Sequence, residues 1–138
     1  MNRSQLDKYI TDYYGVRAER LFEKNPGFQA YRHNDTKKWF AMIMDLPESR
    51  LGLDGQKIID VVNLKCDPIL IGSLRLEQGF YPAYHMNKEN WITAVLDSGA
   101  LDAQIRTLLA MSYDMTAPGR GRTAKKRNKN QAAAGHLR

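Results

Sequence analysis

Apolar residues recur along this chain with two different spacings, and the changes of spacing divide it into helices and strands. Near the N-terminus, apolar residues at positions 6, 9, 10 and 13 share one helical face, which predicts a helix from about Ser4 to Tyr14. Ser4 followed by Asp7 resembles a capping box, and Gly15 is typical of the position just after a helix. The first element is therefore expected to be an amphipathic helix.

Two apolar runs follow, joined by a short polar segment, and together they predict a β-hairpin. The runs are Phe28 to His33 and Lys38 to Leu46, and Asn34 to Lys37 is a turn of hairpin length. The second run is apolar at odd and even positions alike, which predicts a central strand covered on both faces. A shorter strand is expected before this hairpin, near Arg20 to Lys24.

The middle of the chain predicts a strand and then a helix. The segment from Lys57 to Lys65 is rich in β-branched residues and follows a loop from Pro47 to Gly55. Asp67 followed by Pro68 is typical of a helix start, because the aspartate caps free N–H groups and proline lacks the N–H that would be unpaired. This helix is expected to run to about Gln78.

The last part of the body predicts a second hairpin and a final helix. The hairpin strands are Tyr81 to His85 and Asn90 to Leu96, joined by Met86 to Glu89. The helix is expected from about Ala100 to Tyr113. Its predicted caps are Asp97 or Ser98, and its predicted buried face consists of Leu101, Ile105, Leu108 and Leu109.

The predicted order is helix, three or four strands, helix, two strands, helix. Hairpin connections give an antiparallel sheet, and amphipathic helices need a sheet face, so the fold class is a two-layer α+β domain with an antiparallel sheet flanked by helices. The 138 residues fit one domain over residues 1–117, followed by a basic tail over residues 118–138. The tail contains one large apolar residue, Leu137, and is expected to be disordered.

Charge is distributed unevenly between body and tail. The formal net charge is +6, but residues 118–138 hold seven basic residues and no acidic one, so residues 1–117 carry 14 basic against 15 acidic residues.

No apolar run approaches the roughly 20 residues of a membrane helix, and the N-terminus lacks the apolar stretch of a signal peptide. Cys66 is the only cysteine, so no internal disulfide forms. A cytoplasmic protein without membrane contact is expected.

Cys66 is the first candidate for chemistry. It precedes the predicted helix start at Asp67, where the helix dipole would stabilise a thiolate, and His33 or His85 would be the base. The alternative is an unreactive thiol at an element boundary. No catalytic motif surrounds Cys66, the three histidines share no metal-ligand spacing, and no glycine-rich phosphate loop is present. We therefore expect no enzymatic activity, no cofactor and no metal.

Basic residues at the two predicted turns are candidates for phosphate and base contacts. Such a turn either binds a polyanion or is a solvated turn without a partner, and spacing alone leaves both open. The tail run either adds phosphate contacts or only solubilises the chain. The candidates at the turns are Arg32, Lys37, Lys38, His85, Asn87 and Lys88, and those in the tail are Arg120, Arg122, Lys125, Lys126, Arg127 and Lys129.

Three segments resemble a known family. They are Trp39 to Met44, Val62 to Pro68, and Pro82 to Lys88 followed by Trp91-Ile92-Thr93. In this order they resemble the MmcQ/YjbR family, over about residues 5–116. The resemblance implies a compact α+β fold similar to CyaY-like domains, DNA binding through a proposed "double wing" of paired strands, and no established enzymatic activity. The motif positions are Asn63, Lys65, Cys66, Asp67, Pro68, Tyr84, His85, Met86, Asn87, Lys88 and Trp91.

These observations predict a small non-enzymatic DNA-binding module. Its wings would be Arg32 to Lys38 and His85 to Lys88, with Lys65 and Arg75 adding phosphate contacts and the tail adding sequence-independent affinity. One alternative is a protein-interaction or chaperone-like domain that recruits a peptide at a strand edge. Another is an enzyme or small-molecule binder that uses Cys66, His85 and Tyr84.

Overall fold

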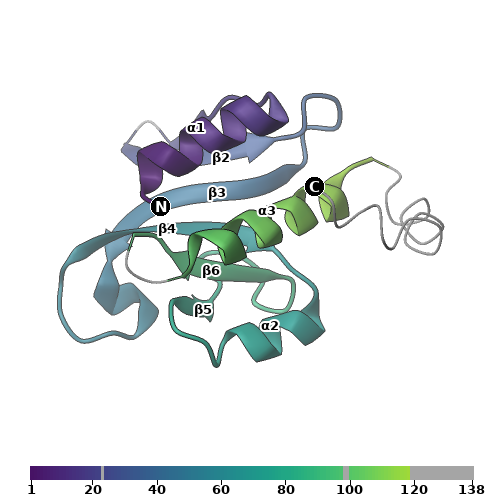
Figure 1. Cartoon of the computed structure of the whole chain (residues 1–138). Coiled ribbons are helices and arrows are strands. Elements are labelled where there is room, and N and C mark those ends of the chain that lie inside the picture. Colours follow the sequence, from purple (N-terminus) through teal and green to yellow (C-terminus); the bar gives the residue numbers. More distant parts are fainter. Residues whose placement is uncertain (23, 98–99, 119–138) are drawn as a thin grey trace.

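The computed structural model describes residues 1–22, 24–97 and 100–118 (Figure 1). The six candidate cations of the tail lie outside these residues, and so does the segment that was expected to be disordered. The helices are α1 (Arg3–Tyr14), the short 3-10 helix η1 (Glu48–Leu51), α2 (Pro68–Leu74) and α3 (Asp102–Thr116). The strands are β1 (Glu19–Phe22), β2 (Asn25–Arg32), β3 (Trp39–Pro47), β4 (Ile58–Lys65), β5 (Phe80–Pro82) and β6 (Trp91–Val95).

The six strands form one antiparallel sheet in the order β1-β2-β3-β4-β6-β5. Apolar residues of α1, α2 and α3 join the same buried cluster as Ile43 and Val62 of the sheet, so all three helices cover one face (Figure 1). The predicted two-layer α+β fold is confirmed, and the observed order of α-helices and strands is the predicted one; the 3-10 helix η1 lies in the segment that was predicted as a loop.

The central strand β3 is buried on both faces, as its unbroken apolar run predicts. Ile43 faces the helices, whereas Met42 and Met44 belong to a second buried cluster on the opposite face of the sheet. Leu51 of η1 and Tyr84 of the loop after β5 pack against that second cluster. This face carries none of the three α-helices, so we call it the helix-free face; η1 and loops cover part of it.

The first helix begins one residue earlier than predicted, and its cap differs. The side chain of Asn2 accepts a hydrogen bond from the Gln5 N–H (2.9 Å), and the Gln5 side chain accepts one from the Asn2 N–H (2.8 Å). Ser4 as the cap was wrong because this capping box starts two residues before it. Gly15 ends the helix as predicted, with φ +67° and its N–H bonded to the Thr11 carbonyl.

The start of α2 is confirmed and its end is earlier than expected. Asp67 accepts a hydrogen bond from the Ile69 N–H (2.8 Å), and Pro68 occupies the first helical position. The helix stops at Leu74 instead of near Gln78. From Leu76 on, the N–H groups bond to carbonyls only three residues back, which tightens the chain into a turn that ends the α-helix.

The third helix begins at Asp102, two residues later than expected. Asp97 does not cap it, because the N-cap position is Leu101, four residues further along the chain; the other expected cap, Ser98, lies outside the described residues. Leu101 is 67% exposed instead of buried, because it precedes the first helical turn. The other predicted core positions, Ile105, Leu108 and Leu109, are buried.

The first predicted hairpin turn is confirmed and the second differs. His33 and Lys38 close the first turn, with the His33 N–H 2.9 Å from the Lys38 carbonyl oxygen. In the second, β5 ends at Pro82, and Tyr84 and His85 lie in a loop and not in a strand. His85 has φ +60°, a left-handed conformation that does not continue a strand.

Candidate nucleic-acid interface

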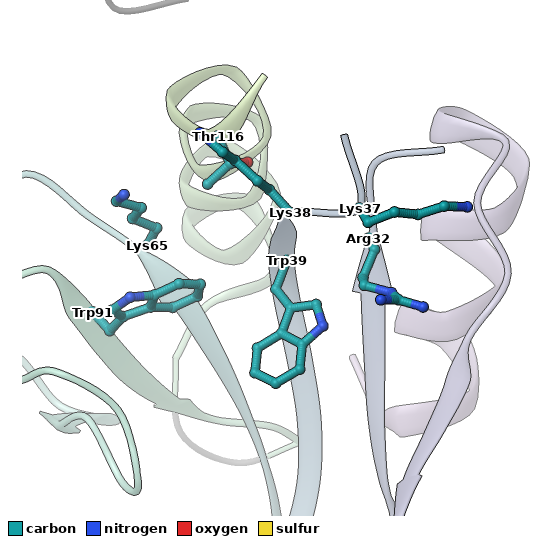
Figure 2. Close-up of a pocket in the computed structure, with 7 residues that line it drawn as sticks. All are labelled: Arg32, Lys37, Lys38, Trp39, Lys65, Trp91 and Thr116. Carbon is teal, nitrogen blue, oxygen red and sulfur yellow. The ribbon is translucent and has the colours of Figure 1, made fainter. Parts of the chain in front are cut away.

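The sheet divides into two ribbons at one end. The pairing of β3 with β4 stops at Ala41 and Leu64. Beyond this point β3 stays paired with β2, through Trp39 opposite Arg32, while β4 stays paired with β6, through Lys65 opposite Trp91. An opening therefore lies between a β2–β3 ribbon and a β4–β6 ribbon, as Figure 2 shows.

A β-bulge sets the direction of Trp39. Tyr31 pairs with Ala41 and Arg32 pairs with Trp39, which leaves Phe40 as the extra residue on β3. Phe40 and Ala41 both belong to the cluster under the helices. The extra residue reverses the alternation of the strand, so Trp39 lies on the helix-free face with Lys65 and Trp91.

The Ser112 side chain of α3 occupies the opening from the helix side. Its hydroxyl donates to the Phe40 carbonyl (2.5 Å) and accepts a hydrogen bond from the Lys65 N–H (2.9 Å). These two backbone groups lie just beyond the last β3–β4 pair, so the serine satisfies groups that a continuous ladder would have paired. Ser112 thus bridges the two ribbons at Phe40 and Lys65, where the direct pairing of β3 and β4 has ended.

An open hollow of about 490 Å³ lies at this end of the sheet, and we call it the tryptophan hollow. Figure 2 shows the Trp91 indole extending toward Trp39, with Lys65 beside Trp91. The chain has only two tryptophans, and both line the hollow. Trp39 is 36% exposed and Trp91 is half-buried. The full lining is Arg32, Lys37, Lys38, Trp39, Lys65, Trp91 and Thr116.

The four cations of the hollow differ in whether an ion pair already neutralises them. Arg32 forms an ion pair with Glu19 through two hydrogen bonds of 2.5 and 2.9 Å, and this contact lowers the pKa of the Glu19 carboxyl below its usual value. In Figure 2, Arg32 and Lys37 point away from the indoles, toward the α1 side. Among the described residues Lys38 and Lys65 form no ion pair, so their charges are available to an anion.

The second predicted wing is a loop anchored to the sheet. The Asn63 side-chain N–H donates to the Tyr84 carbonyl (2.8 Å), and the Tyr84 N–H donates to the Thr93 hydroxyl oxygen (3.0 Å). The Thr93 hydroxyl in turn donates to the Asn63 side-chain oxygen. Asn63 and Thr93 are fully buried, so this polar network fixes the loop through satisfied groups.

Asn87 and Lys88 shape the same loop. The Asn87 side-chain oxygen accepts a hydrogen bond from the Glu89 N–H (2.8 Å). The Asn87 backbone carbonyl accepts one from the Trp91 backbone N–H (3.0 Å). The Lys88 ammonium donates to the Ala83 carbonyl (3.0 Å). Several residues that carry the family resemblance therefore hold the loop that leads into Trp91.

The tryptophan hollow gathers four of the predicted phosphate contacts: Arg32, Lys37, Lys38 and Lys65. The other three lining residues were not among the predicted contacts: Trp39, Trp91 and Thr116. The run Lys37-Lys38-Trp39, basic residues beside an aromatic one, is the signal that points to Trp39. The predicted contacts Arg75, His85, Asn87 and Lys88 do not line the hollow.

The environment of Cys66 disfavours a thiolate. The residue is buried, and this burial raises the pKa of its thiol. His33 is committed elsewhere: its Nε2 lies 2.9 Å from the Thr116 hydroxyl, and its ring packs against Phe40 and Tyr113. The described residues contain no group of three potential metal ligands, and none of their helices has the length and apolarity to cross a membrane.

The six-stranded antiparallel sheet with three helices on one face defines a small two-layer α+β domain, opened at one end by its two ribbons. Within that class, the chain belongs to the YjbR family, whose model matches residues 11–115. A relative from Bacillus subtilis (strain 168), the uncharacterized protein YyaQ, is 36% identical over 116 residues, which cover 84% of this chain and 98% of the relative.

Solved structures show the same fold. A crystal structure of a Pseudomonas syringae protein has a TM-score of 0.81 and 44% identity, and it covers 85% of this chain and 100% of that chain. A solution structure of a protein from the same species has a TM-score of 0.75 at 44% identity, covering 85% and 94%. A Deinococcus radiodurans crystal structure, 18% identical, has a TM-score of 0.63 over 86% and 80% of the two chains, a likeness of fold alone.

Proposed function

We propose that this domain binds DNA at the end of its sheet where the two ribbons separate. The observation that carries the proposal is the tryptophan hollow, which brings two indoles together with Lys38 and Lys65, two cations that form no ion pair among the described residues. Cations hold phosphates, and exposed indoles offer faces for bases, so one surface supplies both kinds of contact that nucleic-acid binding needs.

Local charge supports the proposal better than net charge does. Residues 1–117 carry 14 basic and 15 acidic residues, so the body as a whole attracts polyanions weakly. Lys38 and Lys65 lie at one end of the sheet without ion-pair partners among the described residues. A cluster of unpaired cations attracts phosphates locally even on a nearly neutral body.

Peptide binding at a strand edge has weaker support. The edge strands are β1 and β5, with four and three residues, and β5 ends in Pro82, which donates no backbone hydrogen bond. Short edges with proline are features that discourage strand addition. The buried thiol of Cys66 likewise gives the enzyme alternative little support.

Lys65→Gln tests the proposal against a matched control on the same strand. Lys57 immediately precedes β4 and Lys65 ends it, so the two residues are roughly 25 Å apart at ~3.3 Å per residue. Lys57→Gln removes the same charge from the opposite end of the sheet. The full chain and both variants are titrated with a labelled duplex and with one of its strands, over a series of salt concentrations.

We expect Lys65→Gln to weaken binding severalfold. It should also make binding less dependent on salt. The slope of log affinity against log salt concentration should become shallower by about 0.7 for the single strand or about 0.9 for the duplex. Lys57→Gln should leave the slope nearly unchanged. Equal effects of the two variants would contradict the proposal, because they would indicate a response to net charge alone.

A further inference from the structure

We propose that the ligand of the tryptophan hollow is single-stranded nucleic acid, with an unpaired base held between Trp39 and Trp91 and its flanking phosphates on Lys38 and Lys65. This inference rests on the proposed function and specifies which form of nucleic acid the site takes. The chain places its only two tryptophans at this one hollow, on two ribbons that the sheet holds apart.

The two indoles are available to a ligand. Within the described part of the chain, neither ring stacks on another aromatic ring, in contrast to the packed rings of Tyr14, Phe40 and Tyr113. The Trp91 indole extends toward Trp39 across the opening (Figure 2). The part of an indole face that solvent reaches gains from being covered, and a planar base stacks on such a face.

Contacts on both sides of the opening fix the residues that border it. The bulge at Phe40 turns Trp39 to the helix-free face, and the Ser112 hydroxyl occupies the backbone positions where β3 and β4 would otherwise close. The backbone of Trp91 is fixed by the hydrogen bond from its N–H to the Asn87 backbone carbonyl. The hollow of about 490 Å³ lies within the usual range for small-ligand sites.

A single strand suits this site better than a duplex. The bases of a duplex are stacked on one another, so an indole reaches a base face only after unstacking, whereas an unpaired strand offers its faces directly. Every base has such a face, so the site should tolerate all sequences. Lys38 and Lys65, on the two ribbons, are placed to contact phosphates on either side of the held base.

The test uses the tryptophan fluorescence of the full chain, which reports on the hollow alone because both tryptophans line it. The protein is titrated with an oligothymidine strand, with an abasic strand of equal length, and with a duplex. The abasic strand is the matched control, since it carries the same phosphates and no base. Trp39→Leu and Trp39→Phe are titrated in parallel; leucine keeps an apolar side chain, and phenylalanine also keeps a ring.

We expect oligothymidine to quench the fluorescence and to bind about 5- to 150-fold more tightly than the abasic strand. Trp39→Leu should lose most of that difference, and Trp39→Phe should keep most of it. The duplex should bind more weakly than oligothymidine and quench less.

Equal affinity for oligothymidine and the abasic strand would overturn this proposal. If binding of both strands then still weakened in Lys65→Gln and not in Lys57→Gln, the proposed function would stand and only the held base would be wrong. Binding that Lys65→Gln leaves unchanged would instead contradict the proposed function itself.

Discussion

Glu19 limits the positive charge of the tryptophan hollow. Its carboxylate pairs with Arg32, the cross-strand partner of Trp39, and so neutralises one of the four cations there. The pKa of Glu19 is lowered mainly by its hydrogen bond to Arg32. The pair is therefore intact at neutral pH and is lost only as the pH falls through the lowered pKa of Glu19.

Glu19→Gln should increase DNA affinity. The substitution removes a negative charge and releases the Arg32 guanidinium for a phosphate. Because the energy of an exposed ion pair is small, the DNA affinity should rise by up to about fivefold. Glu48→Gln makes the same change of net charge just after β3, at the opposite end of the sheet. The affinities are compared by titration at one salt concentration. A gain no larger than that of Glu48→Gln would contradict a phosphate contact for Arg32.

At the residue scale, the caps at Asp67 and Gly15 could be predicted, whereas the starts of α1 and α3 and the direction of Trp39 could not. Asp67 and Gly15 act on groups within four residues of themselves, so their roles depend only on nearby sequence. The direction of Trp39 depends on a bulge opposite β2, and a bulge arises from pairing between distant segments. The pattern of β3 is apolar at both parities, so it contained no signal of the reversal.

At the element scale, α3 connects the helix layer to the interface. Ser112 is fully buried and bonds to the backbone of both β3 and β4 at the point where they separate. Further along the same helix, the buried Thr116 lines the hollow and contacts His33. The position of the two ribbons therefore depends on the packing of this helix.

Ser112→Ala should destabilise the domain. It removes the partner of the Phe40 carbonyl and of the Lys65 N–H and leaves these buried groups unpaired, at about 1–3 kcal/mol. Ser73→Ala, at an exposed position of α2, is the matched control and should be neutral or slightly stabilising, because alanine favours helix. Urea unfolding of the full chain measures both variants. Equal stability of Ser112→Ala and the parent chain would contradict the role given to this serine.

The elements themselves could be predicted wherever local sequence dominates. The turn between β2 and β3 and the start of α2 contain their own signals, and both were confirmed. The segment after β5 could not be read in this way. Its path depends on Asn63 and Thr93, which lie on other strands and bind the Tyr84 backbone, so a pattern of alternating residues resembled a longer strand.

At the scale of the whole molecule, charge and shape have separate roles. Seven of the 21 basic residues lie in residues 118–138, whereas the tryptophan hollow belongs to a body with 14 basic and 15 acidic residues. We expect the tail to add sequence-independent affinity and the hollow to fix where the nucleic acid lies. The net charge alone would have pointed to the tail, and only the folded sheet brings the cations of distant segments together.

Nuclear magnetic resonance of the two indole N–H groups shows directly whether nucleic acid occupies the hollow between the two ribbons. In the isotope-labelled full chain, the two tryptophans give two indole N–H signals, both from the hollow. Both signals should shift together, and saturate, as a single-stranded oligonucleotide is added. Indole signals that stay unchanged while the oligonucleotide is demonstrably bound would contradict binding in the hollow.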